Sequence, residues 1–156
     1  MDIEKLYPET KDYIWGGNKL REYGKTSDKD RIAESWELSF HPDGPSRLAD
    51  GRLLKDVATK RDWGENAARF PFFPILIKFI DAKDNLSVQV HPSDEYALAN
   101  EGQFGKTEMW YIAEAEEGAG IYLGFGKDVT AEEFGKAIEE GTVLDLLNFF
   151  KVKKGE

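Results

Sequence analysis

An alternation of apolar and polar side chains in short segments is the feature that most restricts how this chain can fold. In residues 32–40 the apolar side chains fall at every second position, with Glu34 among them, and mainly polar side chains fall between. A period of two is typical of a β-strand, because successive side chains point to opposite faces. The turn-forming residues 41–45 then end the segment. Further strands are predicted over residues 75–81, 86–91, 107–113, 120–124 and 148–153.

Helices are predicted to be fewer and short. The sequence Thr130-Ala131-Glu132-Glu133 has the spacing of a capping box, which predicts a helix that ends at Gly141. Ser93 begins a second helix near residues 96–100, and two more are expected over residues 18–23 and 53–60. The sequence therefore predicts a mainly β fold with short inserted helices.

Composition limits the classes of protein to which the chain can belong. Its 156 residues contain no repeat or linker, which predicts a single domain over residues 1–156. Lys and Arg number 21 against 30 Asp and Glu, a net charge of −9, which argues against nucleic-acid and membrane partners. The absence of Cys excludes disulfides and thiolate sites. With no signal peptide, and with an apolar run far shorter than the roughly 20 residues of a membrane-spanning helix, a soluble, cytoplasmic protein is expected.

Uncharged polar side chains on one strand face indicate a lined cavity. In residues 86–91, Ser87, Gln89 and His91 share a face, and in the next predicted strand Lys106 and Glu108 lie on one side. If the two strands share a sheet, Gln89, His91 and Glu108 can converge. Their nitrogen and oxygen donors suit a divalent cation such as zinc or manganese. The alternative is an ordinary surface strand that carries a lone histidine.

Two charged residues lie among apolar neighbours on predicted strands. Lys78 shares a face with Leu76 and Ile80, and Glu34 lies between Ile32 and Trp36. An isolated charge at such a position is costly unless it is paired or faces a polar ligand. Either Glu34 and Lys78 form a structural salt bridge, or Lys78 extends to the surface, or Lys78 and Lys106 bind an anion such as a phosphate.

Two other motifs are interpreted as structural and not as functional. Trp15-Gly16-Gly17 is interpreted as a tight turn, and His41, in the proline- and glycine-containing turn, as structural. GxGxxG, Walker A and GxSxG sequences are absent, so nucleotide-binding and serine-hydrolase functions have no support in the sequence.

Five ordered blocks of the sequence resemble the N-terminal half of type I phosphomannose isomerases (mannose-6-phosphate isomerases), in particular their short bacterial form. The similarity extends over essentially the whole chain, with the blocks in the same order and at similar spacing. The blocks are IWGG at residues 14–17, AESWELSFHPDGPS at 33–46, FPILIKFID at 73–81, LSVQVHPSD at 86–94 and GKTEMWY at 105–111.

This resemblance implies a cupin-type, jelly-roll-like β-barrel enzyme. It would use one zinc ion to interconvert mannose 6-phosphate and fructose 6-phosphate through an enediol, so a sugar phosphate is the expected small-molecule partner. By similarity, three of the four zinc ligands are Gln89, His91 and Glu108. Positions that match the family's substrate pocket are Trp15, Glu34, Lys78, Ser87 and Lys106. The catalytic acid or base is then Lys106, Glu34 or a water on the metal, of which Lys106 is preferred.

One departure from the family pattern concerns the fourth ligand. In the family a later histidine completes the zinc site and a catalytic arginine follows, whereas this sequence ends at Glu156 before either residue. The resemblance therefore implies an incomplete barrel, the front half of a longer enzyme, and an inactive isolated 156-residue chain. The alternative is a natural short protein that acts as a non-catalytic sugar-phosphate-binding or regulatory cupin domain.

Overall fold

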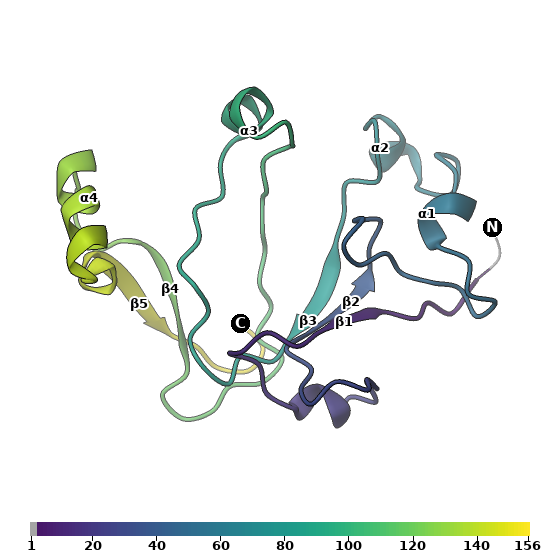
Figure 1. Cartoon of the computed structure of the whole chain (residues 1–156), viewed down its shortest axis with the longest axis horizontal. Helices are drawn as coiled ribbons and strands as arrows, with labels where there is room; N and C mark the ends of the chain where they lie inside the picture. The colour runs from purple at the N-terminus through teal and green to yellow at the C-terminus, as the bar shows by residue number, and fades with distance from the viewer. Residues whose placement is uncertain (1–2) are drawn as a thin grey trace. The chain divides into compact units, whose positions relative to one another are not determined.

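The computed structural model describes residues 3–156, which form two compact units (Figure 1). The first unit ends at Gln89 and the second runs from Val90 to Glu156. Each unit contains one small antiparallel sheet and a few short helices, so the mainly β prediction is confirmed. The prediction of one domain over residues 1–156 stays a prediction.

The first unit is built on a three-stranded antiparallel sheet. Its strands are β1 (Glu9–Lys11), β2 (Glu34–Leu38) and β3 (Ile77–Ile80), and β2 lies in the centre. The strands predicted over residues 32–40 and 75–81 are thus confirmed, with shorter bounds. The three-residue strand β1 was not predicted, because it is too short for an alternation to be recognised.

Strand register determines which side chains of the first unit meet. Trp36 lies opposite Lys78 of β3, and Glu34 lies opposite Lys11 of β1. Because side chains alternate along a strand and paired positions share a face, all four side chains project from the same face of the sheet. On the opposite face, Ser35 donates a hydrogen bond to Glu37 (2.7 Å), which also pairs with Lys25.

The core of the first unit surrounds the beginning of β2. Ile32 and Ala33, just before β2, are fully buried, and Leu20, Leu48 and Leu54 of the same unit are also buried. Three short helices contribute to this unit: η1 (Lys19–Arg21), α1 (Leu54–Val57) and α2 (Glu65–Ala68). The helices predicted over residues 18–23 and 53–60 therefore exist as single turns, and α2 was not predicted.

The second unit contains a two-stranded antiparallel sheet and three helical segments. Strands β4 (Gly120–Phe125) and β5 (Leu147–Lys151) pair with Ile121 opposite Phe150. The helices are α3 (Asp94–Asn100), α4 (Ala131–Glu140) and η2 (Val143–Leu146). Both strands and the helices α3 and α4 match the predicted elements.

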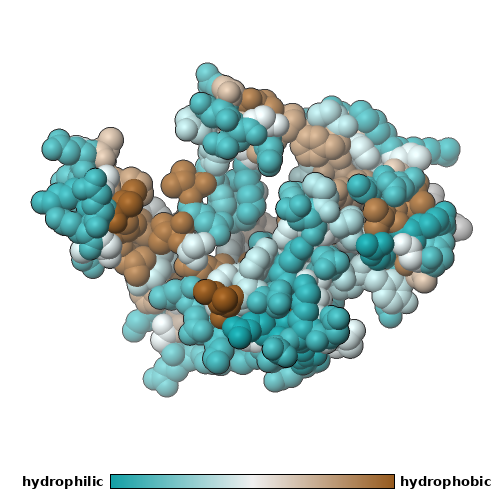
Figure 2. All heavy atoms as spheres, in the orientation of Figure 1, coloured by the Kyte–Doolittle hydropathy of each residue, from teal (hydrophilic) through white to brown (hydrophobic). Residues whose placement is uncertain are grey.

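Exposed aromatic and aliphatic side chains gather on the sheet of the second unit. Figure 2 shows hydrophobic atoms beside α4 and over β4 and β5. The exposed side chains of these strands are Tyr122, Leu123, Phe125, Phe149 and Phe150. A two-stranded ribbon buries little apolar surface by itself, which explains why these residues stay accessible.

The strands predicted over residues 86–91 and 107–113 are not formed. Figure 1 draws both segments as tubes, and within residues 3–156 neither is paired in a sheet. A strand exists only where a second strand satisfies its backbone hydrogen bonds. The apolar positions that suggested strands are solvent-exposed, with 77% of Val90 and 92% of Met109 accessible. The alternation thus describes segments that are not paired in a sheet, although Ile112 exchanges two backbone hydrogen bonds with Gly155 and Glu156.

Helix α4 begins and ends at the residues that local sequence patterns predict. Thr130 accepts a hydrogen bond from the Glu133 backbone, and the Glu133 carboxylate accepts one from the Thr130 backbone (2.8 Å). These bonds lower the pKa of Glu133, led by the backbone N–H of Thr130. Gly141 ends the helix with a φ of 71°, a left-handed conformation that favours glycine. The predicted capping box and helix stop are confirmed.

Thr130→Ala is expected to destabilise the second unit by about 1 kcal/mol, since it removes the side-chain cap. Because folding lowers the pKa of Glu133, the bond of its carboxylate to the Thr130 backbone contributes above the unfolded pKa and is lost as the pH falls, and Thr130→Ala keeps this bond. Thr142→Ala is the matched control, because Thr142 precedes η2 without a side-chain cap bond. Urea unfolding monitored by circular dichroism should separate the two variants, and equal effects would show that the cap contributes nothing specific.

None of the helices in residues 3–156 has both the length and the apolar character needed to cross a lipid bilayer.

Candidate functional site

Three of the predicted site residues meet in the second unit. His91 Nε2 lies 2.9 Å from Glu108 Oε2, and Lys106 Nζ lies 2.6 Å from Glu108 Oε1. Trp110 donates its indole N–H to Glu108 Oε2 over 3.3 Å. Both oxygens of one carboxylate are therefore engaged, and a histidine nitrogen and a lysine ammonium are held beside them.

The Glu108 carboxylate is strongly favoured in its charged form. Partial burial acts to raise the pKa of Glu108. Hydrogen bonds from Lys106 and Trp110, the Lys106 charge and the hydrogen bond to His91 outweigh this effect and lower the pKa to about 2. Glu108 is thus an anionic oxygen donor near neutral pH.

The His91–Glu108 pair has part of the chemistry that a zinc site needs. Two donors of one tetrahedral zinc, each bound at about 2.0 to 2.2 Å, lie roughly 3.4 Å apart, slightly farther than this pair. Imidazole nitrogen and carboxylate oxygen are both zinc ligands. Within the described part of the chain, however, no three His, Cys, Asp or Glu side chains gather into a metal-holding group. The pair fits a metal as two donors that need further ligands.

Gln89 and Ser87 lie at the end of the first unit. The amide of Gln89 donates a hydrogen bond to the Ser87 hydroxyl over 3.1 Å. This contact agrees with the prediction that the two side chains share one side of the segment. The convergence of Gln89 with His91 and Glu108 stays a prediction, since these residues belong to different units.

Glu34 and Lys78 form the salt bridge that was one of the predicted alternatives. Lys78 Nζ lies 2.9 Å from Glu34 Oε1, and the Glu34 residue is 4% exposed. The second oxygen of Glu34 accepts the indole N–H of Trp36 over 2.7 Å. The pair explains how two charges are tolerated among apolar neighbours. The contact of Lys78 with an anion stays a prediction.

Trp15 lies in the tight turn that follows β1. Its ring stacks on Tyr13, with centroids 5.5 Å apart, and its carbonyl accepts the backbone N–H groups of Lys83 and Asp84. The following Gly16 N–H bonds to the Tyr13 carbonyl over 2.9 Å, as expected for the tight turn predicted here.

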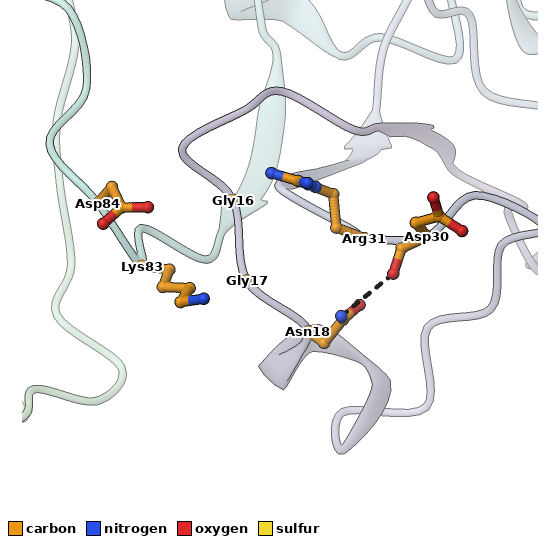
Figure 3. A pocket seen from close by; sticks show the side chains of 7 residues that line it. All are labelled: Gly16, Gly17, Asn18, Asp30, Arg31, Lys83 and Asp84. Atoms are coloured by element: carbon orange, nitrogen blue, oxygen red, sulfur yellow. Dashed lines mark hydrogen bonds between the residues drawn. The ribbon is translucent and has the colours of Figure 1, made fainter.

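A polar hollow of about 300 Å³ adjoins this turn (Figure 3). Gly16 and Gly17 lie between Lys83 and Asp84 on one side and Arg31 on the other. Asn18 and Asp30, joined by a hydrogen bond of 3.1 Å, complete the lining. The two acidic and two basic side chains balance, so the hollow favours neither an anion nor a cation.

A second hollow, of about 520 Å³, lies beside α3 and is lined by Val90, Pro92, Tyr96 and Glu101. None of the predicted site residues lines either hollow. The candidate site is therefore defined by its polar contacts and not by a cavity.

Comparison with known proteins identifies the family. A model of the type I phosphomannose isomerase catalytic domain matches residues 3–119. The chain belongs to the type I phosphomannose isomerase family. The resemblance stated for the five sequence blocks is thereby confirmed.

Phosphomannose isomerases of known sequence and structure match along nearly the whole chain. Mannose-6-phosphate isomerase of Streptococcus mutans is 41% identical over 92% of this chain and 46% of its own length. ManA of Bacillus subtilis is 38% identical over 100% and 51%. A crystal structure of the mannose 6-phosphate isomerase from Bacillus subtilis superposes with a TM-score of 0.86 at 36% identity, over 97% and 50%. The chain spans about half the length of these relatives.

Two tryptophans that were not predicted as site residues complete the polar contacts of this chain. Trp36 binds Glu34, and Trp110 binds Glu108. In each case the tryptophan follows the glutamate by two positions in the sequence. The strand parity had placed each tryptophan on the face of its carboxylate, so the signal was present. Because an indole is mostly apolar, strand parity alone does not show that its N–H binds the carboxylate.

Proposed function

We propose that this chain forms part of a zinc-dependent aldose–ketose isomerase that interconverts mannose 6-phosphate and fructose 6-phosphate. The observation that carries the proposal is the contact of His91, Lys106 and Glu108 in a member of the phosphomannose isomerase family. Metal donors and a candidate proton carrier are thus adjacent in one unit.

His91 and Glu108, with Gln89, are the proposed metal ligands. A bound zinc would act as a Lewis acid toward the sugar oxygens. Isomerisation through an enediol moves a proton between C1 and C2, so an acid or base must lie beside these carbons. Lys106 is proposed for this role, because its Nζ is held 2.6 Å from Glu108 Oε1.

Trp15, Glu34, Lys78 and Ser87 are the proposed substrate contacts. Lys78 is the candidate for the phosphate. Its ammonium binds Glu34, and an ammonium group has three donors, so further donors remain for a ligand oxygen. The Lys78 side chain is 22% exposed, which leaves it accessible from one side.

A cupin-type β-barrel is the proposed fold of the whole protein. Two features of the described residues support it. The segments over residues 86–91 and 107–113 alternate like strands but have no strand partner, and the relatives are about twice as long as this chain. Strands contributed by further sequence would pair with these segments and cover their apolar side chains.

A coupled isomerase assay tests the proposed activity. The protein expressed from its complete natural coding sequence should convert mannose 6-phosphate to fructose 6-phosphate. The activity should be lost after chelation and restored by zinc. Failure of the metal-loaded protein to turn over this sugar phosphate would overturn the proposal.

Residues 1–156 expressed alone are expected to be inactive, because the sequence lacks the later histidine and arginine that the family resemblance implies. The 156-residue chain is compared with the complete product at equal zinc and substrate concentration. Sugar-phosphate binding by calorimetry, without turnover of the complete product, would instead favour the non-catalytic binding function. Full activity of residues 1–156 would show that the missing residues are not required.

A further inference from the structure

The two oxygens of the buried Glu34 carboxylate accept hydrogen bonds from two different kinds of donor. Oε1 accepts from the charged ammonium of Lys78 (2.9 Å), and Oε2 accepts from the neutral indole N–H of Trp36 (2.7 Å). Trp36 itself is only 8% exposed. The shorter bond is thus made by the donor that carries no charge and cannot titrate.

The Trp36 ring is held in place by groups from two other segments. Lys11 Nζ lies 4.8 Å from the ring centroid and donates a 2.6 Å hydrogen bond to the Asp43 carbonyl. His41 packs edge-on against the ring, with centroids 5.6 Å apart. A Cβ at Gly44 would lie 2.7 Å from Trp36 Cε3, so the turn approaches the ring as closely as a glycine permits.

Lys78 and Trp36 therefore support Glu34 in two different ways. A lysine ammonium compensates the charge, but its flexible stem allows the carboxylate to move with it. An indole has two side-chain torsions, and here its ring is fixed on its face and edges. Its N–H therefore defines the direction in which the carboxylate points. Functional groups must be held to within about 0.5 Å, which a second supporting residue achieves.

We propose that Trp36 is a positioning residue, which orients the Glu34 carboxylate for substrate through its indole N–H. The inference rests on the proposed isomerase function, in which Glu34 contacts the sugar phosphate. The turn at residues 41–45, interpreted from sequence as structural, then has a purpose: it clamps the indole that holds Glu34.

The test compares two tryptophans in the protein expressed from its complete natural coding sequence. Trp36→Phe keeps the aromatic ring and removes the N–H. Trp63→Phe is the matched control, because the Trp63 ring packs against Phe40 and Phe73, while its buried N–H has no hydrogen-bond partner among residues 3–156. Trp36→Phe should lower kcat/KM for mannose 6-phosphate about tenfold. Trp63→Phe should leave it within about twofold.

A double-mutant cycle separates positioning from packing. In a Glu34→Ala background, Trp36→Phe should have less than about a twofold further effect, because the group that it positions is gone. Lys11→Met is a second variant that tests the same role if Trp36→Phe does not fold. It loosens the ring without altering the indole, and it should lower kcat/KM only when Glu34 is present.

The outcomes are distinguishable. Equal effects of Trp36→Phe and Trp63→Phe on kcat/KM would overturn the positioning role, as would an undiminished effect of Trp36→Phe in the Glu34→Ala background. A wild-type protein that does not isomerise mannose 6-phosphate would overturn the proposed function itself, and the substrate role of Glu34 with it.

Discussion

His91→Ala should abolish zinc retention and isomerase turnover together in the protein expressed from its complete natural coding sequence. His91 supplies the single nitrogen among the three proposed ligands. Changes to residues that merely support a ligand cost about 10- to 100-fold in metal affinity, so the loss of a ligand should cost at least as much. The measurement is zinc per protein by mass spectrometry after gel filtration, alongside the coupled assay.

Glu108→Ala should give the same two losses, since Glu108 is the anionic donor and also holds Lys106. Glu139→Ala is the matched control, because Glu139 lies on the exposed side of α4 in the same unit. It should leave zinc content and turnover unchanged. Undiminished activity of His91→Ala would show that the metal assignment is wrong, and retained zinc without turnover would place His91 in the chemistry and not in the metal site.

Lys78→Met should destabilise the first unit by about 2 to 3 kcal/mol. The substitution leaves the buried Glu34 carboxylate without its cation, and removal of one partner of a buried pair costs about 3–5 kcal/mol. The expected loss of stability is smaller than this because Lys78 is partly exposed. Urea unfolding of the 156-residue chain, followed by tryptophan fluorescence, gives the measurement.

Two further variants make this result specific. Adding Glu34→Gln to Lys78→Met should restore most of the lost stability, since a neutral amide oxygen still accepts the Trp36 N–H. Lys136→Met removes an exposed lysine that lies 3.7 Å from Glu140 on α4, and it should change stability by less than about 0.5 kcal/mol. A Lys78→Met chain as stable as Lys136→Met would mean that Glu34 does not need its partner.

Sequence patterns were sufficient where they act within a few residues of an element's end, or where they show which face of a strand carries a charge. Helix α4 was predicted with its boundaries, because the capping box and Gly141 act within a few residues of the helix ends. The Glu34–Lys78 pair was among the predicted alternatives, because strand parity shows which charges face an apolar row. The contact between Lys106 and Glu108 follows from the same parity.

Sequence patterns were not sufficient where a structure depends on other segments that no local pattern identifies. Residues 86–91 alternate as a strand does, but alternation describes the faces of a segment and does not supply the backbone that must pair with it. The role of Trp36 was missed for a related reason. Its contacts with Lys11 and the turn at residues 41–45 come from three segments, and no spacing in the sequence shows that they meet.

The polar bonds on both faces of β2 also restrict how that strand can change. Most half-buried strands are kept in frame by one apolar face. Here Trp36 and Lys78 bind Glu34 on one side, while Ser35 and Lys25 bind Glu37 on the other. A slip of β2 by one residue would leave the two bonds within the strand in place, but it would move Glu34 away from Lys78 and Glu37 away from Lys25. A change of length that separates Glu34 or Glu37 from its lysine is therefore expected to lower the stability of the first unit.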